Sequence, residues 1–203
     1  MRWKWIGLLV AGAIALVAAG GWVLESWLVA QQPSRGKALI ENEFSLVDHT
    51  GKPVTDEDFE GKWQLVFFGF TFCPDVCPTT LTTVSAVVEG LGDDADKIAP
   101  LFITVDPERD TPEVMSEYVA NFDPRIVGLT GSPEQIEQAS QAFRAYYTRV
   151  EQDGVPDGYT MDHSAFLYLM SPDGEYATHF SPGEEPGAIA EEIRAYPTGE
   201  KTL

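Results

Sequence analysis

Two cysteines lie four positions apart, at Cys73 and Cys77, and the sequence contains no others. This spacing allows the two sulfur atoms to approach each other as ligands of one metal ion or as a disulfide. The thiolate form binds metals and attacks disulfides, and the positive end of a helix dipole favours it. A passive structural disulfide is the alternative, although a loop this short gives little cross-linking stabilisation. The spacing alone therefore leaves metal binding and redox chemistry both open.

A third candidate ligand is His163, which directly precedes a strongly apolar run that ends at Met170. Two thiolates and one imidazole form a soft ligand set that suits copper(I), with room for a further ligand on copper(II). Zinc normally takes a fourth protein ligand or a water molecule. A single histidine is more often a hydrogen-bonding group than a ligand, and this alternative stays open for His163. We expect no metal-binding role for His49 and His179.

Three acidic residues are candidates for supporting such a site. Asp75 lies between the cysteines, where a carboxylate would attract a cation and change the thiol pKa values. Asp106 begins an acidic motif that follows an apolar run. Its carboxylate could direct a hydrogen bond behind the ligands or guide the docking of a partner. Asp162 could orient the ring of His163. A structural or solvated role is the alternative for each carboxylate.

The elements that position these residues are predicted from apolar patterns. Residues 63–70 are almost wholly apolar, as expected for a strand buried on both faces, and the cysteines follow it directly. Pro78 suits the first position of a helix with an apolar stripe from Leu81 to Leu91. Because ligand sites in open α/β sheets form beyond the carboxyl ends of strands, we expect the site at this strand end.

The rest of the chain alternates between predicted strands and helices. Thr111 and Ser132 are N-cap residues followed by proline, and Ser132 has capping-box spacing to Gln135. Residues 55–60 predict one helical turn and residues 186–196 a terminal helix. Further strands are predicted at residues 43–48, 100–105, 125–130, 146–150, 164–170 and 175–180. This order predicts an α/β protein of thioredoxin-like fold, with a mixed central sheet flanked by helices and an added N-terminal hairpin.

The N-terminus predicts a membrane anchor. Residues 6–24 carry no charge, and this length spans a bilayer core of about 30 Å. Arg2 and Lys4 precede the segment, which places its N-terminus in the cytoplasm and the following domain outside. Removal as a signal peptide is the alternative. We therefore divide the chain into an anchor (residues 1–30), a tether (31–42) and a soluble domain (43–203).

Charge sets further limits. The chain has 32 acidic and 13 basic side chains and a formal net charge of −19. Only Arg2, Lys4 and Glu25 are charged within residues 1–30, so the acidity belongs to the soluble domain. Such a domain repels phosphate backbones, which argues against nucleic-acid binding, and it favours a basic docking partner.

Three motifs in this order resemble the SCO/SenC family. They are Cys73-Pro74-Asp75-Val76-Cys77-Pro78, Val105-Asp106-Pro107-Glu108-Arg109-Asp110-Thr111 and Asp162-His163-Ser164. The resemblance covers about residues 44–195 and implies a membrane-tethered thioredoxin-like protein that assists copper insertion into cytochrome c oxidase. It also implies that Cys73, Cys77 and His163 are copper ligands. Met161 stands where the family often has valine.

The function expected from this resemblance is that of a copper metallochaperone rather than an enzyme. Its cargo would be Cu(I), Cu(II) or both, and its partners would be cytochrome c oxidase subunit II and another periplasmic copper carrier. The expected location is the bacterial inner membrane, single-pass, with the domain in the periplasm. The alternative is a thiol-disulfide oxidoreductase, with Cys73 and Cys77 redox-active, that keeps the cysteines of the oxidase copper site reduced.

Overall fold

The computed structural model describes residues 40–196, so the predicted anchor at residues 6–24 lies outside the described residues. Its centre is a seven-stranded sheet with the strand order β2-β1-β5-β4-β3-β8-β9. β3, β4 and β5 run parallel, whereas β1, β2, β8 and β9 join the sheet through antiparallel pairs. The strands are β1 (Ser45–Asp48), β2 (Pro53–Thr55), β3 (Trp63–Gly69), β4 (Ile98–Thr104), β5 (Val127–Thr130), β8 (Leu167–Met170) and β9 (Tyr176–Phe180). The predicted mixed sheet and N-terminal hairpin are confirmed.

Strands β3 and β4 form the core of the sheet because every residue in both is buried. Their apolar sequences leave no polar face for solvent, as expected of strands covered on both sides. The one exception in β3 is Gln64, whose Oε1 accepts a hydrogen bond from Asn42 Nδ2 at 3.1 Å. This hydrogen bond reduces the cost of burying the Oε1 atom. β3 is therefore a firmly held platform for the loop that follows it.

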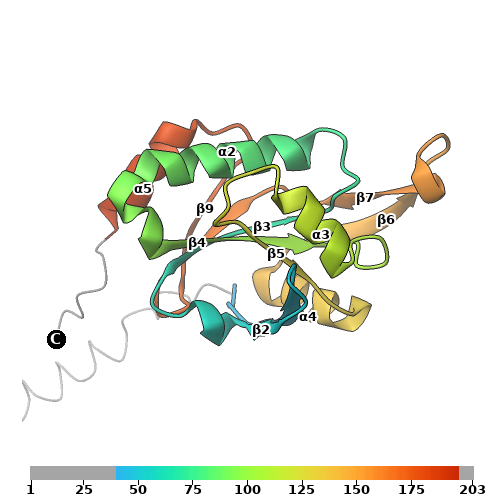
Figure 1. Ribbon diagram of the computed structural model, residues 1–203, viewed down its shortest axis with the longest axis horizontal. Helices are drawn as coiled ribbons and strands as arrows, with labels where there is room; N and C mark the ends of the chain where they lie inside the picture. The colour runs from blue at the N-terminus through green and yellow to red at the C-terminus, as the bar shows by residue number, and fades with distance from the viewer. Residues whose placement is uncertain (1–39, 197–203) are drawn as a thin grey trace, which may run out of the picture. The chain divides into compact units, whose positions relative to one another are not determined.

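Helices cover both faces of the sheet. α2 (Val76–Leu91) and α5 (Pro186–Ala195) pack together over one face, α4 (Pro133–Phe143) covers the opposite face, and α3 (Pro112–Val119) links β4 to β5 (Figure 1). The predicted stripe of α2 is buried from Leu81 to Leu91. The predicted caps are also present: Thr111 accepts from the Val114 amide, and Ser132 forms a capping box with Gln135. Three short 3-10 segments complete the elements, at Asp56–Phe59, Gly92–Lys97 and Pro156–Gly158.

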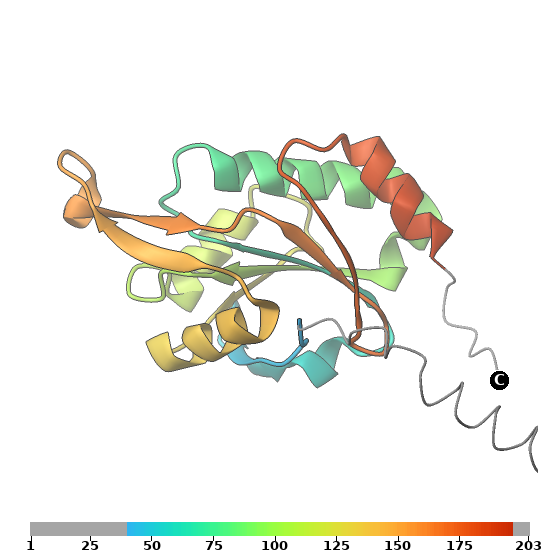
Figure 2. The same ribbon diagram turned by 180° about the vertical axis from the view of Figure 1, so that it is seen from behind.

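Two local predictions are wrong. α2 begins at Val76, so Pro78 is its third residue rather than its first. The strand predicted from Ser164 begins only at Leu167, and the residues before it form an unpredicted strand, β7 (Tyr159–His163). β7 pairs with β6 (Tyr147–Glu151) as a separate two-stranded sheet, which extends away from the body as an arm (Figure 2). The five residues of β7 give only a short strand pattern, because few of the side chains in this strand are buried.

Within residues 40–196, no helix is both long enough and apolar enough to cross a membrane. The proposed division into anchor, tether and domain therefore stays a prediction.

Candidate metal centre

The cysteines occupy the turn between β3 and α2, as the sequence predicts. Cys73 lies in the turn and is partly exposed, whereas Cys77 is the second residue of α2 and its side chain is fully buried. The Cys77 amide donates a hydrogen bond to Cys73 Sγ at 3.4 Å. Unpaired amides at a helix N-terminus stabilise negative charge, so this position favours a thiolate. Both cysteines are free thiols in this structure.

Gly69, the last residue of β3, makes room for the buried sulfur. A Cβ atom at this position would lie 2.8 Å from Cys77 Sγ and 2.9 Å from ring atoms of Phe67 and Phe102. No real side chain fits at these distances. The absence of a side chain at Gly69 is therefore what lets Cys77 pack its sulfur against the end of the strand.

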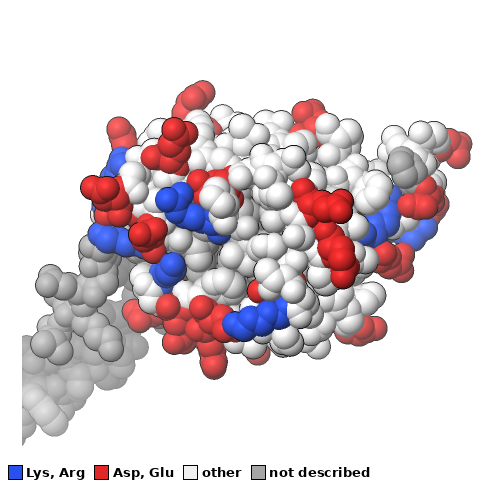
Figure 3. Space-filling view, in the orientation of Figure 1, with Lys and Arg blue, Asp and Glu red and all other residues white. Residues whose placement is uncertain are grey.

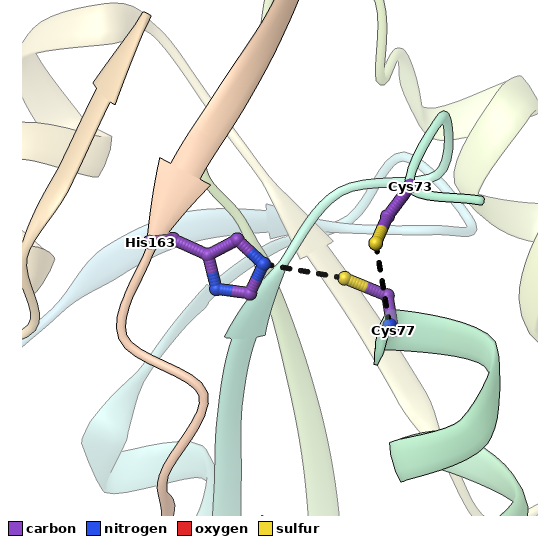
Figure 4. Close-up of side chains that lie close together, drawn as sticks. All are labelled: Cys73, Cys77 and His163. Carbon is purple, nitrogen blue, oxygen red and sulfur yellow. Dashed lines mark hydrogen bonds between the residues drawn. The ribbon is translucent and has the colours of Figure 1, made fainter. Parts of the chain in front are cut away.

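His163 reaches the cysteines from the arm formed by β6 and β7. Its Nε2 lies 3.4 Å from Cys77 Sγ, and its Nδ1 lies 3.0 Å from the carbonyl oxygen of Ser164 (Figure 4). A carbonyl oxygen can only accept, so Nδ1 carries a proton, and Nε2 is the ring nitrogen that faces Cys77 Sγ. Such a hydrogen bond fixes the orientation of a ligating imidazole. The edges of Phe67 and Phe70 further enclose the ring.

The three ligand atoms of Cys73, Cys77 and His163 all lie within 4.8 Å of one another. Cys73 and His163 line a pocket of about 270 Å³, together with Pro74, Asp75, Met161 and Asp162. Among the described residues, these three form the group of histidine, cysteine and acidic side chains that could hold a metal ion. The structure thus brings together the three residues that the sequence singled out, from two segments 86 positions apart.

The two thiols have opposite electrostatic environments. The pKa of Cys73 is lowered to about 3, chiefly by a hydrogen bond from the Cys77 thiol and further by His163 and by the Asp75 and Cys77 amides, against the effect of burial. The pKa of Cys77 is raised, because its proton is held in the hydrogen bond to Cys73 and because the thiolate would be buried. One thiolate and one thiol therefore share a proton, and the exposed member carries the charge.

The three candidate acids lie in different surroundings. Asp75 and Asp162 are exposed at the rim of the pocket. Nδ1 of His163 pairs with Ser164, not with Asp162. Asp106 is almost fully buried behind the site, where it forms an ion pair with Arg109 and accepts a hydrogen bond from the Tyr159 hydroxyl at 3.0 Å. The predicted role of these three carboxylates in supporting the metal ligands stays a prediction.

Asp110 ties the cysteine turn to the neighbouring strand, a role not predicted from the sequence. Its fully buried carboxylate accepts hydrogen bonds from the amide and hydroxyl of Thr71 and from the hydroxyl of Thr104. Burial raises the pKa of this carboxyl against the effect of these donors. The position of Asp110 in an acidic motif beside the predicted site was the available signal, but the sequence does not show which threonines it contacts.

The other two histidines have structural contacts. His49 Nδ1 accepts a hydrogen bond from the Gly128 amide at 3.1 Å. His179 packs edge-on against Phe166, with ring centroids 5.0 Å apart. Neither belongs to the group around the cysteines.

Known proteins resemble this chain over most of its length. The family model SCO1/SenC matches residues 32–198. The human protein SCO1 homolog, mitochondrial, is 43% identical over 163 residues, which cover 79% of this chain and 54% of the human protein. The chain thus spans about half the length of this curated relative, and the same holds for an Arabidopsis thaliana relative, of which 51% is covered.

Two solved structures show the same fold. Bradyrhizobium japonicum ScoI with copper bound has 44% identity and a TM-score of 0.72, over 78% of this chain and 99% of that chain. Arabidopsis thaliana ScoI with copper bound has 38% identity and a TM-score of 0.72, over 77% and 99% respectively. The family match, the sequence identities and the shared fold agree. This chain belongs to the SCO1/SenC family.

Proposed function

We propose that this chain is a copper metallochaperone that binds copper through Cys73, Cys77 and His163. The observation that carries this proposal is the convergence of two sulfur atoms and one imidazole nitrogen within 4.8 Å. Soft sulfur ligands select copper(I), and an additional imidazole also suits copper(II). Two similar proteins have been solved with copper bound. The donor set of this chain therefore fits the metal that its relatives hold.

The same geometry suits delivery rather than permanent storage. Cys77 is fully buried, whereas Cys73 and His163 are partly exposed at the pocket. An incoming ligand from a partner can reach copper from the side of Cys73 and His163 while Cys77 still holds it. Stepwise replacement of ligands avoids release of free copper. In this proposal, copper is cargo, and the exposed pair of ligands is exchanged first.

The proposed recipient is the copper site of cytochrome c oxidase subunit II, reached directly or through another periplasmic carrier. Membership of the SCO1/SenC family supports this proposal. In the proposal, residues 6–24 anchor the chain in the bacterial inner membrane as a single pass, with the N-terminus in the cytoplasm and the domain in the periplasm. Acidic side chains are spread over the face seen in Figure 3, which would favour a basic docking surface on the partner.

A second candidate function is favoured by the thiolate of Cys73. A partly exposed cysteine with a pKa of about 3 is ionised at neutral pH and can attack a disulfide. Cys73 would form a mixed disulfide with one target sulfur and release the other as a thiol. Cys77 would then attack Cys73, which releases the second target thiol and leaves a Cys73–Cys77 disulfide. The chain would thereby supply two electrons to reduce the oxidase cysteines before copper arrives.

An anaerobic copper titration of the full chain in its reduced form tests the main proposal. We expect one copper per chain and, with copper(II), an absorption band from sulfur-to-copper charge transfer. Absence of that band would contradict the ligand assignment. Measuring the reduction potential of the cysteine pair in parallel distinguishes the second candidate. The chain can reduce its target only if its own potential lies below that of the target disulfide, and such a potential with negligible copper uptake favours thiol-disulfide exchange.

A further inference from the structure

The arm that carries His163 is joined to the body in an unusual way. β6 and β7 form their own two-stranded sheet, and neither strand is hydrogen-bonded into the seven-stranded sheet. An isolated two-stranded hairpin is marginally stable in water. Backbone pairing within the arm therefore does not determine where His163 lies relative to the cysteines. Contacts between side chains of the arm and the body therefore contribute to this placement, together with the short segment of residues 164–166 that joins β7 to β8.

Tyr159, the first residue of β7, makes such contacts. Its side chain is almost fully buried, and its hydroxyl donates a hydrogen bond to Asp106 Oδ1 at 3.0 Å. The Arg109 guanidinium lies 3.8 Å from the centre of the Tyr159 ring, and the Arg149 guanidinium lies 3.6 Å from it. Arg109 also donates a hydrogen bond to the Tyr159 carbonyl oxygen at 3.3 Å. The start of β7 is thus attached to the loop that follows β4.

Arg109 also contacts the cysteine turn. Its guanidinium lies 4.7 Å from the centre of the ring of Phe72, the residue before Cys73. The same guanidinium also lies against the ring of Tyr159. The ion pair with Asp106, buried on both sides, holds the guanidinium in place. A planar guanidinium can stack on aromatic rings in this way, whereas a lysine ammonium cannot reproduce the geometry. Arg109 therefore lies between the turn that carries the sulfurs and the strand that carries the imidazole.

We propose that Arg109 and Tyr159 are positioning residues that hold His163 at the cysteine pair, and we call them, together with Asp106, the arm clamp. Tyr159 and His163 are the first and last residues of one strand, so fixing the start of β7 fixes the direction in which its end points. The clamp touches neither sulfur nor imidazole. Its effect on copper rests on the proposed function, but its effect on the arm does not.

The test compares Tyr159→Phe, which removes only the hydroxyl, with Arg109→Lys, which keeps the charge and removes the planar stacking. Tyr146→Phe is the matched control, because this tyrosine directly precedes β6 and its side chain is 57% exposed. Amide hydrogen exchange of the metal-free full chain reports on the arm. Competition with a copper(I) chelator then reports on copper retention.

We expect both clamp variants to speed amide exchange in β6 and β7 by roughly 10-fold, near the lower end of the range for loss of a hydrogen bond to a charged group. Exchange in β3 and β4 is expected to stay unchanged. Copper should dissociate about 3- to 10-fold faster, less than the roughly 10- to 100-fold effect of a group that directly supports a ligand. The Tyr146→Phe protein should behave as wild type in both measurements.

Unchanged exchange of the arm in both clamp variants would overturn the inference, whatever their copper binding. Faster exchange confined to the arm supports it, even in the case that the wild-type chain takes up no copper. In that case the proposed function fails while the clamp stands. If the wild-type chain binds copper and arm exchange is unchanged in both clamp variants, the proposed function stands and the clamp fails.

Discussion

The two sides of the candidate metal site are built differently. The sulfur side belongs to the body: Cys77 is fully buried, and its sulfur packs against Gly69 at the end of a strand buried throughout. The imidazole side belongs to an arm outside the seven-stranded sheet, attached through side chains. This difference suggests a division of roles, in which the body retains copper and the arm closes or opens the third ligand position. Substitutions on the sulfur side and on the imidazole side should therefore differ in their effects on copper binding.

Loss of a sulfur ligand should have the largest effect. In Cys77→Ser, a hard oxygen replaces the buried soft ligand, so copper(I) affinity should fall by about 100-fold or more, beyond the range for a group that only supports a ligand. Competition with a copper(I) chelator measures this. Thr82→Ser is a suitable control, because Thr82 is exposed on the same helix. Wild-type affinity in Cys77→Ser would exclude the Cys77 sulfur as a copper ligand.

Loss of the imidazole should weaken binding less. We expect His163→Ala to lower copper(I) affinity sharply, by about 10-fold or more, while two thiolates still retain some metal. Copper(II) should be affected more strongly, because it prefers nitrogen ligands more than copper(I) does. The charge-transfer spectrum and the chelator competition check both expectations. His179→Ala, which changes a histidine packed against Phe166, is the control. Intact copper binding in His163→Ala would exclude the arm from the site.

The structure of the sulfur side could be predicted from the sequence more fully than that of the imidazole side. The buried strand before the cysteines and the stripe of α2 follow from apolar runs, and the caps at Thr111 and Ser132 follow from local chemistry. Such signals are local, so the sequence contains them fully. The three candidate ligands were predicted because each lies in a motif that resembles the SCO/SenC family. The body of the site was therefore predictable almost in full.

The arm was not predictable in the same way. The alternation of apolar and polar residues in β7 covers only four positions, Tyr159 to Asp162, and most of its side chains are only partly covered. The contact between Arg109 and Tyr159 joins residues 50 positions apart, and no local pattern indicates which residues meet over that distance. Even where His163 was expected to face the cysteines, its hydrogen bond to the Ser164 carbonyl depended on the path of the chain after β7. Side-chain contacts that attach the arm to the body produce no local pattern that a single sequence would show.

The sulfur side should also show a distinct pH dependence. Since the pKa of Cys73 is lowered to about 3, its alkylation rate by iodoacetamide should stay nearly constant from pH 8 to pH 5. An ordinary thiol would lose about 10-fold in rate for each pH unit below its pKa. By linkage, the thiolate stabilises the fold above the unfolded pKa, and this contribution is lost as pH falls toward 3.

Mass spectrometry of the alkylated chain separates Cys73 from Cys77. In Cys77→Ala, the hydrogen bond that is the largest cause of the lowered pKa is lost, so the rate at pH 5 should fall. A wild-type rate that already falls steeply between pH 8 and pH 5 would show that the two thiols do not share a proton as described.

The smallest predicted effect concerns the packing behind the sulfur. Gly69→Ala would place a Cβ atom 2.8 Å from Cys77 Sγ, and relieving this overlap should cost about 1–3 kcal/mol in the free energy of unfolding. Gly90→Ala on α2 is the matched control, since its Cβ would meet Ala190 at an ordinary 3.6 Å and should stabilise the helix by about 0.5–1 kcal/mol. Urea unfolding of the metal-free full chain measures both.

The copper affinity of Gly69→Ala then shows whether the packing of Gly69 against Cys77 Sγ contributes to copper binding. If the body holds the sulfur rigidly, Gly69→Ala should weaken copper binding as well as stability, because Cys77 must move to make room. If copper affinity stayed at the wild-type value despite the lost stability, Cys77 would be free to adjust its position. The sulfur side would then be as adaptable as the arm, and the division between a fixed body and a movable imidazole would not hold.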